Sequence, residues 1–396
     1  MASLGHPERQ FASVHVGGTN GKGSVSTMLA EVLRAAGWRV GLYTSPHLVS
    51  FRERVLVDGA PISEDAVTCW AARLEAPAVR DGATFFEIST ALAFADFAAR
   101  GVDVAVVEVG LGGRLDSTNV ITPLASGVTR IALEHTEYLG TDLASIAREK
   151  AGIAKSGVPF TTTEADPEVA AALLAEAGAR GAVAERLEPA RCLAGVTADG
   201  SGVRFDATTP TRRYEGLRIG LLGAYQAANA LLAVRLQELA GGRFPVDEAA
   251  LRAGLEVARV PGRFDRRGKW LFDVAHNPDG MRALAGVLRA VRPPAPVAAV
   301  VSILRDKAWR EMLEQLAGAV DELILTRAPS APVERAWDLD EAARWAEERG
   351  IAAAACPDFD AALHDAARRA QTVLVTGSFH TVGDAMARLP GASPLG

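Results

Sequence analysis

The chain has 396 residues, of which 49% are hydrophobic and 23% are charged, and its formal net charge is −6. This length predicts two or three domains, and the negative charge argues against a nucleic-acid partner or an anionic membrane surface. The first ten residues lack an apolar signal segment, no apolar run could span a bilayer, and the three cysteines lie far apart. We therefore expect a cytoplasmic protein, monomeric, that acts on small molecules.

The first strong pattern is a strand, a glycine-rich turn and a helix. Val14–Val16 is a short apolar strand, and apolar residues recur at helical spacing across Val25–Leu33. Between them, the turn Gly17–Ser24 would aim backbone N–H groups and the positive end of the helix dipole at one point. This arrangement predicts a phosphate site.

Side chains of the same turn support that prediction. Lys22 adds a positive charge, and the hydroxyls of Thr19 and Ser24 could reach a phosphate or a phosphate-bound Mg²⁺. The strict P-loop pattern is not met, because Val16 stands where its first glycine belongs and Gly23 separates Lys22 from Ser24. An ordinary glycine-rich turn is the alternative.

Further polar residues are placed at the ends of predicted strands. They are Ser45 after the strand Val40–Tyr43, Glu108 in the strand Val102–Val109, and His135 after the strand Val128–Leu133. Strands that alternate with helices predict an α/β fold with a parallel sheet, in which all carboxyl ends meet at one edge. We expect the glycine-rich turn and these three residues to converge there.

Each of these residues also has a structural interpretation. Glu108 could form a salt bridge with Arg114 or Lys150, because a buried carboxylate needs a partner. A lone histidine such as His135 is more often structural than a ligand, and Mg²⁺ prefers oxygen ligands. A lysine on a helix, such as Lys150, is normally a solvated surface residue.

A second, smaller doubly wound unit follows a hinge-like segment, Val260–Arg263. The region 156–215 before it predicts an alanine-rich helix and short antiparallel strands. The second unit contains strands expected at Trp270–Val274, Val297–Ile303, Glu322–Thr326, Ile351–Cys356 and Thr372–Thr376. We expect a mostly parallel P-loop-type domain over 1–260 and a Rossmann-like domain over 261–396. His276 and Ser378 follow strands of the second domain, where His276 could serve a substrate or cap a turn.

Eight segments in order resemble the folylpolyglutamate synthase and dihydrofolate synthase family, a branch of the Mur-ligase-like enzymes. They are His15–Ser24, Thr44–Leu48, Thr84–Glu87, Glu108–Asn119, Glu149–Ile153, Pro261–Phe264, Asp273–Pro278 and Gly377–Phe379. The extra Gly23 favours this folate branch over the muramyl-peptide ligases. The resemblance implies that ATP phosphorylates a substrate carboxylate and that the amine of L-glutamate then attacks the acyl phosphate.

The resemblance also implies roles for individual residues, with Lys22, Lys150 and His276 as the catalytic ones. ATP would be held by Thr19, Asn20, Gly21, Lys22, Gly23, Ser24, Asn229, Arg263 and Asp273. Mg²⁺ would be held by Ser45, Glu108 and His135, with Ser45 replacing Ser24 as the hydroxyl ligand. The pterin would be bound by Thr84, Phe85, Phe86, Glu87, Leu115, Asp116 and Ser117, and L-glutamate by His276 and Ser378. Lys150 would be carbamylated by CO₂.

The chain departs from the family pattern at several positions. The segment that usually precedes the first strand is nearly absent, Glu134 stands where an aspartate is usual, Tyr225 replaces a histidine, and Ala308 replaces an aspartate. These positions concern the substrate rather than the reaction class. The leading hypothesis is a ligase acting on dihydropteroate, a reduced folate or both. The alternatives are a muramyl-peptide-type amino-acid ligase and a P-loop NTPase without condensation activity.

Overall fold

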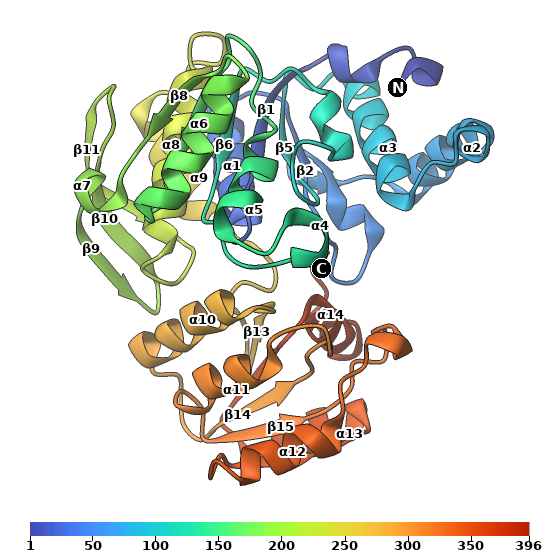
Figure 1. The fold of residues 1–396 in the computed structure, drawn as a ribbon, viewed down its shortest axis with the longest axis vertical. Coiled ribbons are helices and arrows are strands. Elements are labelled where there is room, and N and C mark those ends of the chain that lie inside the picture. The colour runs from blue at the N-terminus through green and yellow to red at the C-terminus, as the bar shows by residue number, and fades with distance from the viewer. Residues whose placement is uncertain (396) are drawn as a thin grey trace.

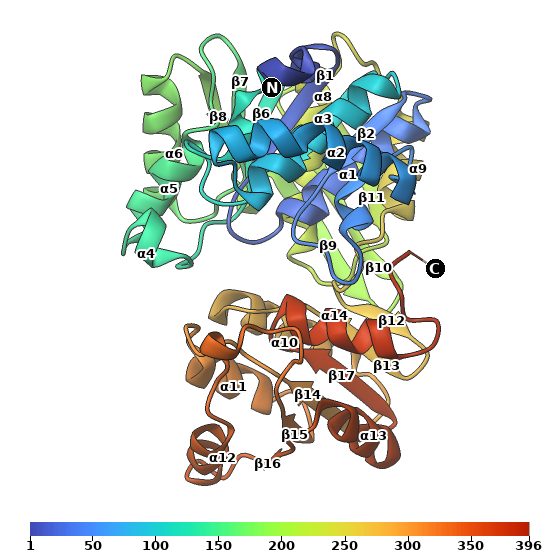
Figure 2. The same cartoon turned by 90° about the vertical axis from the view of Figure 1, so that its right-hand side faces the viewer.

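The computed structural model describes residues 1–395, which form two lobes that lie one above the other along the longest axis (Figure 1). The first lobe contains an eight-stranded sheet and a small three-stranded sheet, and the second contains a six-stranded sheet. The view turned by 90° shows the same division, with the C-terminal segment returning to the level between the lobes (Figure 2). The α/β fold class predicted from the sequence is confirmed.

The eight-stranded sheet is parallel except for its β3 and β4 edge. Its spatial order is β4 (Ala60–Pro61), β3 (Val55–Val57), β2 (Val40–Tyr43), β5 (Val104–Glu108), β1 (Ala12–Gly17), β6 (Ala125–Val128), β7 (Pro159–Thr162) and β8 (Val183–Arg186). The central strands are apolar on both faces, as buried parallel strands require. In β5, for example, Val104 and Val106 belong to one core while Ala105 and Val107 belong to another.

Helices cover both faces of this sheet. One core contains α1 (Lys22–Ala35), α8 (Gln226–Ala240) and α9 (Glu248–Val257), together with the antiparallel strands β9 (Leu193–Asp199), β10 (Gly202–Thr208) and β11 (Arg213–Ile219). The opposite face carries α2 (Glu64–Asp81), α3 (Phe85–Ala99), α5 (Leu143–Ala151) and α6 (Pro167–Ala179). Short helical turns are α4 (Thr136–Leu139), α7 (Pro189–Cys192), η1 (Ala2–Leu4), η2 (Pro7–Arg9), η3 (Phe51–Arg54) and η4 (Ser117–Val120).

The second lobe is a three-layer unit of the same kind. Its sheet order is β12 (Asp265–Arg267), β13 (Trp270–Asp273), β17 (Thr372–Thr376), β14 (Val297–Val301), β15 (Glu322–Leu325) and β16 (Ala353–Ala355), parallel except for β12. One core contains α10 (Pro278–Val291), α11 (Trp309–Ala317) and α12 (Leu339–Glu347), and the other contains α13 (Phe359–Arg369) and α14 (Phe379–Arg388). A short turn, η5 (Val333–Arg335), precedes α12. Two-sided helix packing again makes the central strands continuously apolar.

One sequence-based prediction of secondary structure is wrong in position. The strand expected at Val128–Leu133 is β6 at Ala125–Val128, because the residues after Val128 leave the sheet and Arg130 O accepts hydrogen bonds from the glycine-rich turn. Helix α2 runs to Asp81, although Pro77 lies inside it, and it ends at Gly82 in the left-handed conformation. The apolar stripe ends near Leu74, so the last turns carry no burial signal.

The close packing of α9 on α1 in the first lobe is predicted to be sensitive to a single methyl group. A Cβ at Gly254 of α9 would lie 2.4 Å from the Cα of Val32 in α1. Gly254→Ala should therefore push the two helices apart and reduce the free energy of unfolding by about 1–3 kcal/mol. The measurement is the midpoint of thermal unfolding.

Gly178→Ala is the matched control, since Gly178 lies in α6 and a Cβ placed there would have nothing within 4 Å. That variant should leave stability unchanged or raise it by about 0.5–1 kcal/mol, as expected for a helical glycine. Equal midpoints for the two variants would contradict the packing argument.

Candidate active site

The glycine-rich turn wraps tightly around the N-terminus of α1. Gly18 has a φ of 136°, and a Cβ there would lie 1.8 Å from Thr129 Oγ1, so no larger residue fits. The N–H of Thr19 donates to Arg130 O at 2.9 Å, which fixes the loop against the segment after β6. Lys22 begins α1, and its Nζ donates to Thr19 O at 3.1 Å. A cation at a helix N-terminus inside a glycine loop is suited to phosphate.

A cavity of about 570 Å³ opens from this loop toward the second lobe. Its lining includes Asn20, Gly21, Ser24, Tyr225, Asn229, Arg263, Asp273, Val287 and Val291. Gln226 Nε2 donates to Ser24 Oγ at 3.3 Å, and Asn229 Nδ2 donates to Gln226 Oε1 at 2.7 Å. The cavity is polar at the phosphate loop and apolar at α10, which matches a nucleotide with its phosphates and base at opposite ends.

Glu108 lies at the end of β5, beside the phosphate loop. Its Oε2 accepts a hydrogen bond from the N–H of Ser45 at 3.2 Å, and its side chain is buried. Burial raises the pKa of Glu108, while the positive charge of Lys22 opposes that shift. The salt bridge of Glu108 with Arg114 or Lys150, considered from the sequence, does not form, because Arg114 pairs with Glu149 and Lys150 donates elsewhere.

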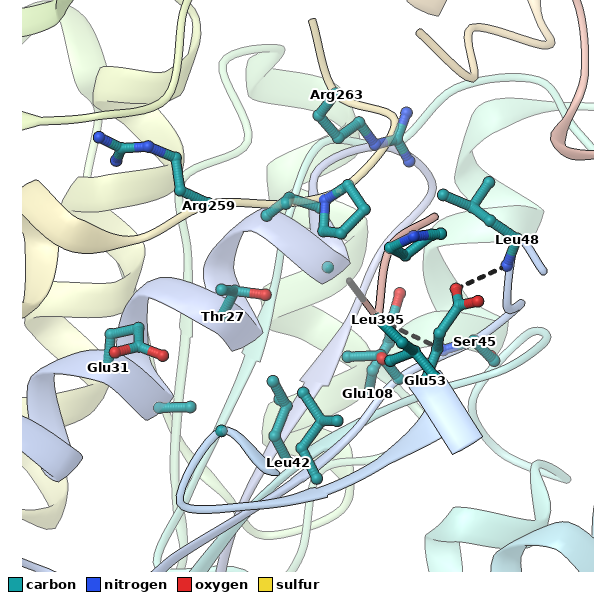
Figure 3. Close-up of a pocket in the computed structure, with 18 of the residues that line it drawn as sticks. Thr27, Glu31, Leu42, Ser45, Leu48, Glu53, Glu108, Arg259, Arg263 and Leu395 are labelled. Atoms are coloured by element: carbon teal, nitrogen blue, oxygen red, sulfur yellow. Dashed lines mark hydrogen bonds between the residues drawn. The ribbon is translucent and has the colours of Figure 1, made fainter. Parts of the chain in front are cut away.

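A second cavity, of about 430 Å³, lies on the other side of Glu108. Figure 3 shows Ser45 and Glu108 close together in it, with Arg263 from the hinge segment across the space and the side chain of the preceding Arg259 pointing away. Leu395 reaches into the same cavity from the C-terminal segment. Arg259 is exposed and donates to the carbonyls of Glu256 and Ala258, so only Arg263 of these two arginines acts on Glu108.

Lys150 is buried, so the surface-lysine interpretation is wrong for this residue. It lies in α5 with 5% of its surface exposed, and its Nζ donates to Gly18 O at 2.9 Å. Burial and the nearby charge of Lys22 lower the pKa of Lys150 to about 7. About half of the molecules therefore carry the neutral amine near pH 7, directly behind the phosphate loop.

His135 does not end a strand as expected. It precedes α4 in a left-handed conformation with a φ of 51°, seven residues after the end of β6. Burial, together with Lys307 and Lys150, lowers the pKa of His135 to about 4, although Glu134 opposes the shift. The ring is therefore neutral at physiological pH, which is the form that can coordinate a metal.

The segments expected to bind a pterin lie next to each other beyond the carboxyl end of β5, the end that carries Glu108. Thr84 caps α3 through a reciprocal arrangement with Glu87, whose Oε2 accepts from Thr84 N at 2.8 Å. The ring of Phe86 packs on Gly110, whereas Phe85 and Leu115 are 62% and 80% exposed. Phe85 and Leu115 thus leave apolar surface on these two segments open to a ligand.

Asp116 and Ser117 face inward from the neighbouring loop. Asp116 Oδ2 accepts from the N–H groups of Gly110 and Leu111 at 3.1 and 2.8 Å, and Oδ1 accepts from Thr118 N at 3.0 Å. Ser117 Oγ lies 2.7 Å from Thr90 Oγ1. The carboxylate of Asp116 therefore holds the shape of the loop that presents Leu115.

The second lobe contacts the phosphate loop directly. Asn277 Nδ2 donates to Asn20 Oδ1 at 3.1 Å, and Arg130 forms an ion pair with Asp279 at 2.8 Å. Asp273 accepts from Phe264 N at 2.9 Å, so this proposed ATP ligand also fixes the hinge. Asn277, Arg130 and Asp279 were not singled out in the sequence. The position of Asn277 in the short loop between β13 and α10, at the carboxyl edge of the sheet, is the signal that would have found it.

His276 and Ser378 both lie at the carboxyl edge of the second sheet. His276 Nε2 is 2.8 Å from Glu134 Oε1 of the first lobe, a contact that sequence reasoning missed. Lys307, also missed, approaches the same oxygen at 3.4 Å. Ser378 caps α14, where its Oγ accepts from Thr381 N at 3.1 Å. The two sheets thus present their carboxyl edges to each other.

No helix within residues 1–395 is long and apolar enough to cross a membrane.

Among the same residues, no group of three or more histidine, cysteine, aspartate or glutamate side chains could hold a metal. A site made of Ser45, Glu108 and His135 contains two such side chains and one hydroxyl. The buried Glu108 accepts one hydrogen bond, so its charge is poorly compensated. Ser45 and Glu108 are adjacent, whereas the His135 ring lies 3.9 Å from Glu134 and makes no contact with Glu108. A cation beside Glu108 fits its carboxylate.

The fold and this site are those of a Mur-type ligase. The Mur ligase middle domain matches residues 16–236, and the Mur ligase glutamate ligase domain matches residues 262–379. Members of this class are ATP-dependent ligases, so the chain is an enzyme of that kind.

More specifically, the chain belongs to the folylpolyglutamate synthase and dihydrofolate synthase family. It is 33% identical to the dihydrofolate synthase/folylpolyglutamate synthase of Bacillus subtilis, over 98% of this chain and 93% of the relative. It is 36% identical to the folylpolyglutamate synthase of Lacticaseibacillus casei, over 84% and 80%. Similar structures include the ADP complex of Mycobacterium tuberculosis folylpolyglutamate synthase, with a TM-score of 0.88, 34% identity and coverage of 98% and 92%. The E. coli FolC complex with DHPP and ADP has a TM-score of 0.83, 35% identity and coverage of 98% and 90%.

Lys22 is predicted to be required for turnover. Replacing it by alanine removes the charge at the N-terminus of α1, where charge would develop on a transferring phosphoryl group, and should lower kcat by about 10²–10³. Steady-state ADP release is the measurement, with circular dichroism to check folding. Lys269→Ala, a substitution in the second lobe away from this loop, should keep normal turnover. Near-normal activity of Lys22→Ala would show that this loop does not take part in the chemistry.

Proposed function

We propose that this ligase joins L-glutamate to dihydropteroate, to a reduced folate, or to both. The observation that carries the proposal is the meeting of two sheet edges, where Asn277 of the second lobe bonds with Asn20 of the phosphate loop and residues of both lobes line the nucleotide-shaped cavity. The names of the relatives and the DHPP in the E. coli FolC complex agree with the same substrates. A muramyl-peptide substrate and a simple NTPase are not favoured by these relatives.

The reaction would proceed in two balanced steps. A substrate carboxylate oxygen attacks the γ-phosphorus of ATP, ADP leaves, and an acyl phosphate forms. The amine nitrogen of L-glutamate then attacks the acyl carbon, inorganic phosphate leaves, and the nitrogen loses a proton. Lys22 would stabilise the charge on the transferring phosphoryl group, and the backbone N–H groups at the start of α1 would orient the phosphates.

We propose that Ser45, Glu108 and His135 hold Mg²⁺. The buried carboxylate of Glu108, with its raised pKa, and the neutral ring of His135 support this choice. When bound, Mg²⁺ would neutralise charge on the phosphates. The phosphates would be surrounded by Thr19, Asn20, Gly21, Gly23 and Ser24. The rest of ATP would be contacted by Asn229, Arg263 and Asp273.

The pterin would lie on the exposed apolar residues Phe85 and Leu115. The other predicted pterin residues would mainly shape that site, since their side chains are engaged in capping, packing or loop contacts. They are Thr84, Phe86, Glu87, Asp116 and Ser117. His276 and Ser378 would lie on the glutamate side. This division assigns ATP and folate mainly to residues 1–260, with Arg263 and Asp273 contacting ATP from the second domain, and L-glutamate to residues 261–396.

Substrate dependence tests the function. Purified enzyme with ATP should release ADP at a high rate when dihydropteroate or tetrahydrofolate is present together with L-glutamate, and the product should gain the mass of one glutamyl residue. Omitting either the pterin or L-glutamate should reduce ADP release to background. The pterin supplies the carboxylate that is phosphorylated, and L-glutamate supplies the amine that consumes the acyl phosphate. ADP release that ignores the pterin would instead support a simple NTPase.

We also propose that Lys150 is carbamylated. A lysine with a pKa of about 10.4 is neutral in on the order of one molecule in a few thousand at pH 7, whereas a pKa of about 7 makes half of the amines available to CO₂. The new carboxylate would face Lys22 and could orient Mg²⁺ or its waters.

Activity should therefore fall in CO₂-depleted buffer and recover with bicarbonate. The bicarbonate response should steepen between pH 6 and pH 8, as Lys150 loses its proton through the pKa of about 7. Lys150→Ala should be nearly inactive and partly rescued by acetate. A mass spectrum without the carbamate, together with full activity without CO₂, would contradict the proposed modification of Lys150.

A further inference from the structure

His15 is a buried histidine that the mechanism above does not use. It lies in β1, a central strand of the first sheet, and none of its surface is exposed. Val14 and Val16 belong to the core on the α1 side, so the alternation of side chains along a strand directs the His15 ring to the opposite face. Burial and the charge of Lys155 lower the pKa of His15 to about 3, so the ring is neutral at physiological pH. A neutral polar ring inside an apolar sheet still needs a hydrogen-bond partner.

The partner of this ring lies in the segment that follows β5. Nε2 of His15 is 2.8 Å from Oγ1 of Thr118 in η4. The Thr118 hydroxyl in turn donates to Oδ1 of Asp116, whose other oxygen accepts from two backbone N–H groups of the same loop at 3.1 and 2.8 Å. All three side chains are buried. A chain of buried hydrogen bonds therefore connects β1 to the carboxylate that holds the shape of the loop over 110–117.

The partners define the direction of these hydrogen bonds. Backbone N–H groups donate to both oxygens of Asp116, so the carboxylate acts as an acceptor and takes the single hydroxyl proton of Thr118. The Thr118 oxygen must then accept from the ring, which places the ring proton of His15 on Nε2. Nδ1 is buried and has no hydrogen-bond partner within residues 1–395. The ring therefore has a single polar contact, and that contact leads to Asp116.

This chain of hydrogen bonds joins two parts of the candidate active site. β1 leads directly into the glycine-rich turn, and His15 lies near the end of that strand. At the other end of the chain, Ser117 Oγ lies 2.7 Å from Thr90 Oγ1 in α3, the helix that begins with the exposed Phe85. The strand that carries the phosphate loop is thereby tied to both segments expected to bind the pterin.

We propose that His15 and Thr118 are positioning residues for the pterin substrate. The ring orients the Thr118 hydroxyl, the hydroxyl orients the Asp116 carboxylate, and the carboxylate holds the loop against which the pterin would lie. Neither His15 nor Thr118 has exposed surface, so both act through Asp116 and not by touching the ligand. The proposal rests on the proposed function, because it assumes that this loop receives the pterin. Loss of the chain should weaken binding of the pterin selectively.

Two substitutions of Thr118 test the hydroxyl group. Thr118→Val keeps the shape of the side chain but removes the proton that Asp116 accepts, so the KM for the pterin substrate should rise about tenfold. The KM values for ATP and L-glutamate should stay within about twofold of the natural values, and kcat at saturating pterin should change less than the pterin KM. Thr118→Ser keeps the hydroxyl and should retain most of the affinity.

Two substitutions of His15 test the ring. His15→Phe keeps a planar ring but removes the donor, and it should raise the pterin KM about tenfold. His15→Gln can place an amide N–H at the position of Nε2, so it should restore most of the affinity. The double variant of His15→Phe and Thr118→Val should be within about twofold of either single variant, because both substitutions break the same chain of hydrogen bonds.

A measurement on the natural enzyme tests the chain without any substitution. Nitrogen NMR of protein labelled at histidine should show the His15 ring as the neutral Nε2–H tautomer, and it should not titrate between about pH 5 and pH 9 because its pKa is about 3. Added pterin should shift this signal. An Nδ1–H tautomer, or a signal that ignores the pterin, would overturn the proposal even if none of the variants folds.

Thr372→Val is the matched control. Thr372 is buried in β17 of the second lobe and its Oγ1 donates to Pro294 O at 2.8 Å, so this change also removes a buried threonine hydroxyl. It should lower the midpoint of thermal unfolding as Thr118→Val does, but leave the pterin KM unchanged. An equal rise of that KM in Thr372→Val would show general loosening and overturn the proposal. An unchanged pterin KM in Thr118→Val, or a rise that extends equally to ATP and L-glutamate, would also overturn it.

The natural enzyme separates this inference from the proposed function. If it shows no ADP release that depends on a pterin and L-glutamate, the function itself is wrong. If it shows that dependence while the pterin KM ignores His15 and Thr118, the function stands and the positioning proposal fails.

Discussion

The central constraint of this structure is the burial of charge at the carboxyl edge of the first sheet. Lys22, Glu108 and Lys150 lie where strand ends, the phosphate loop and α5 meet, and burial pushes the pKa of Glu108 up and that of Lys150 down. Both shifts mean that the charged forms are poorly compensated by the protein alone. Such an edge would be completed by an anionic ligand and by the metal cation that we propose. The rest of the fold keeps these groups in position.

The second lobe completes the site from the opposite side. Its own parallel sheet directs His276 and Asn277 at the first lobe, where Asn277 bonds with Asn20 of the phosphate loop. The contacts between the lobes described above are hydrogen bonds and ion pairs rather than a broad apolar core, and polar interfaces of this kind allow domains to move relative to each other. The nucleotide cavity is bounded by both lobes, so a ligand there would contact both and stabilise their association.

The sequence was sufficient for the order of the elements, because apolar periodicity and strand ends are local signals. The strands Val40–Tyr43 and Thr372–Thr376 have the bounds that were predicted, and the convergence of the phosphate loop, Ser45 and Glu108 follows from a parallel sheet. The burial of Lys150 and the inward turn of Asp116 could not be predicted, since both depend on contacts that only the folded chain makes. Glu134 was noted as a departure from the family pattern, but its reach to His276 required the arrangement of the lobes.

The cost of burying Lys150 argues that its position serves chemistry rather than stability. A shift of its pKa from 10.5 to about 7 corresponds to a penalty on the order of 5 kcal/mol for the protonated form. A structural lysine would offset this penalty with a carboxylate, yet the hydrogen-bond acceptor of Lys150 is the carbonyl of Gly18, and Lys22 repels it. Carbamylation would reverse the sign of that interaction, so that repulsion between two lysines becomes attraction between a cation and an anion. The same change that would complete the active site would therefore also relieve the electrostatic cost of building it.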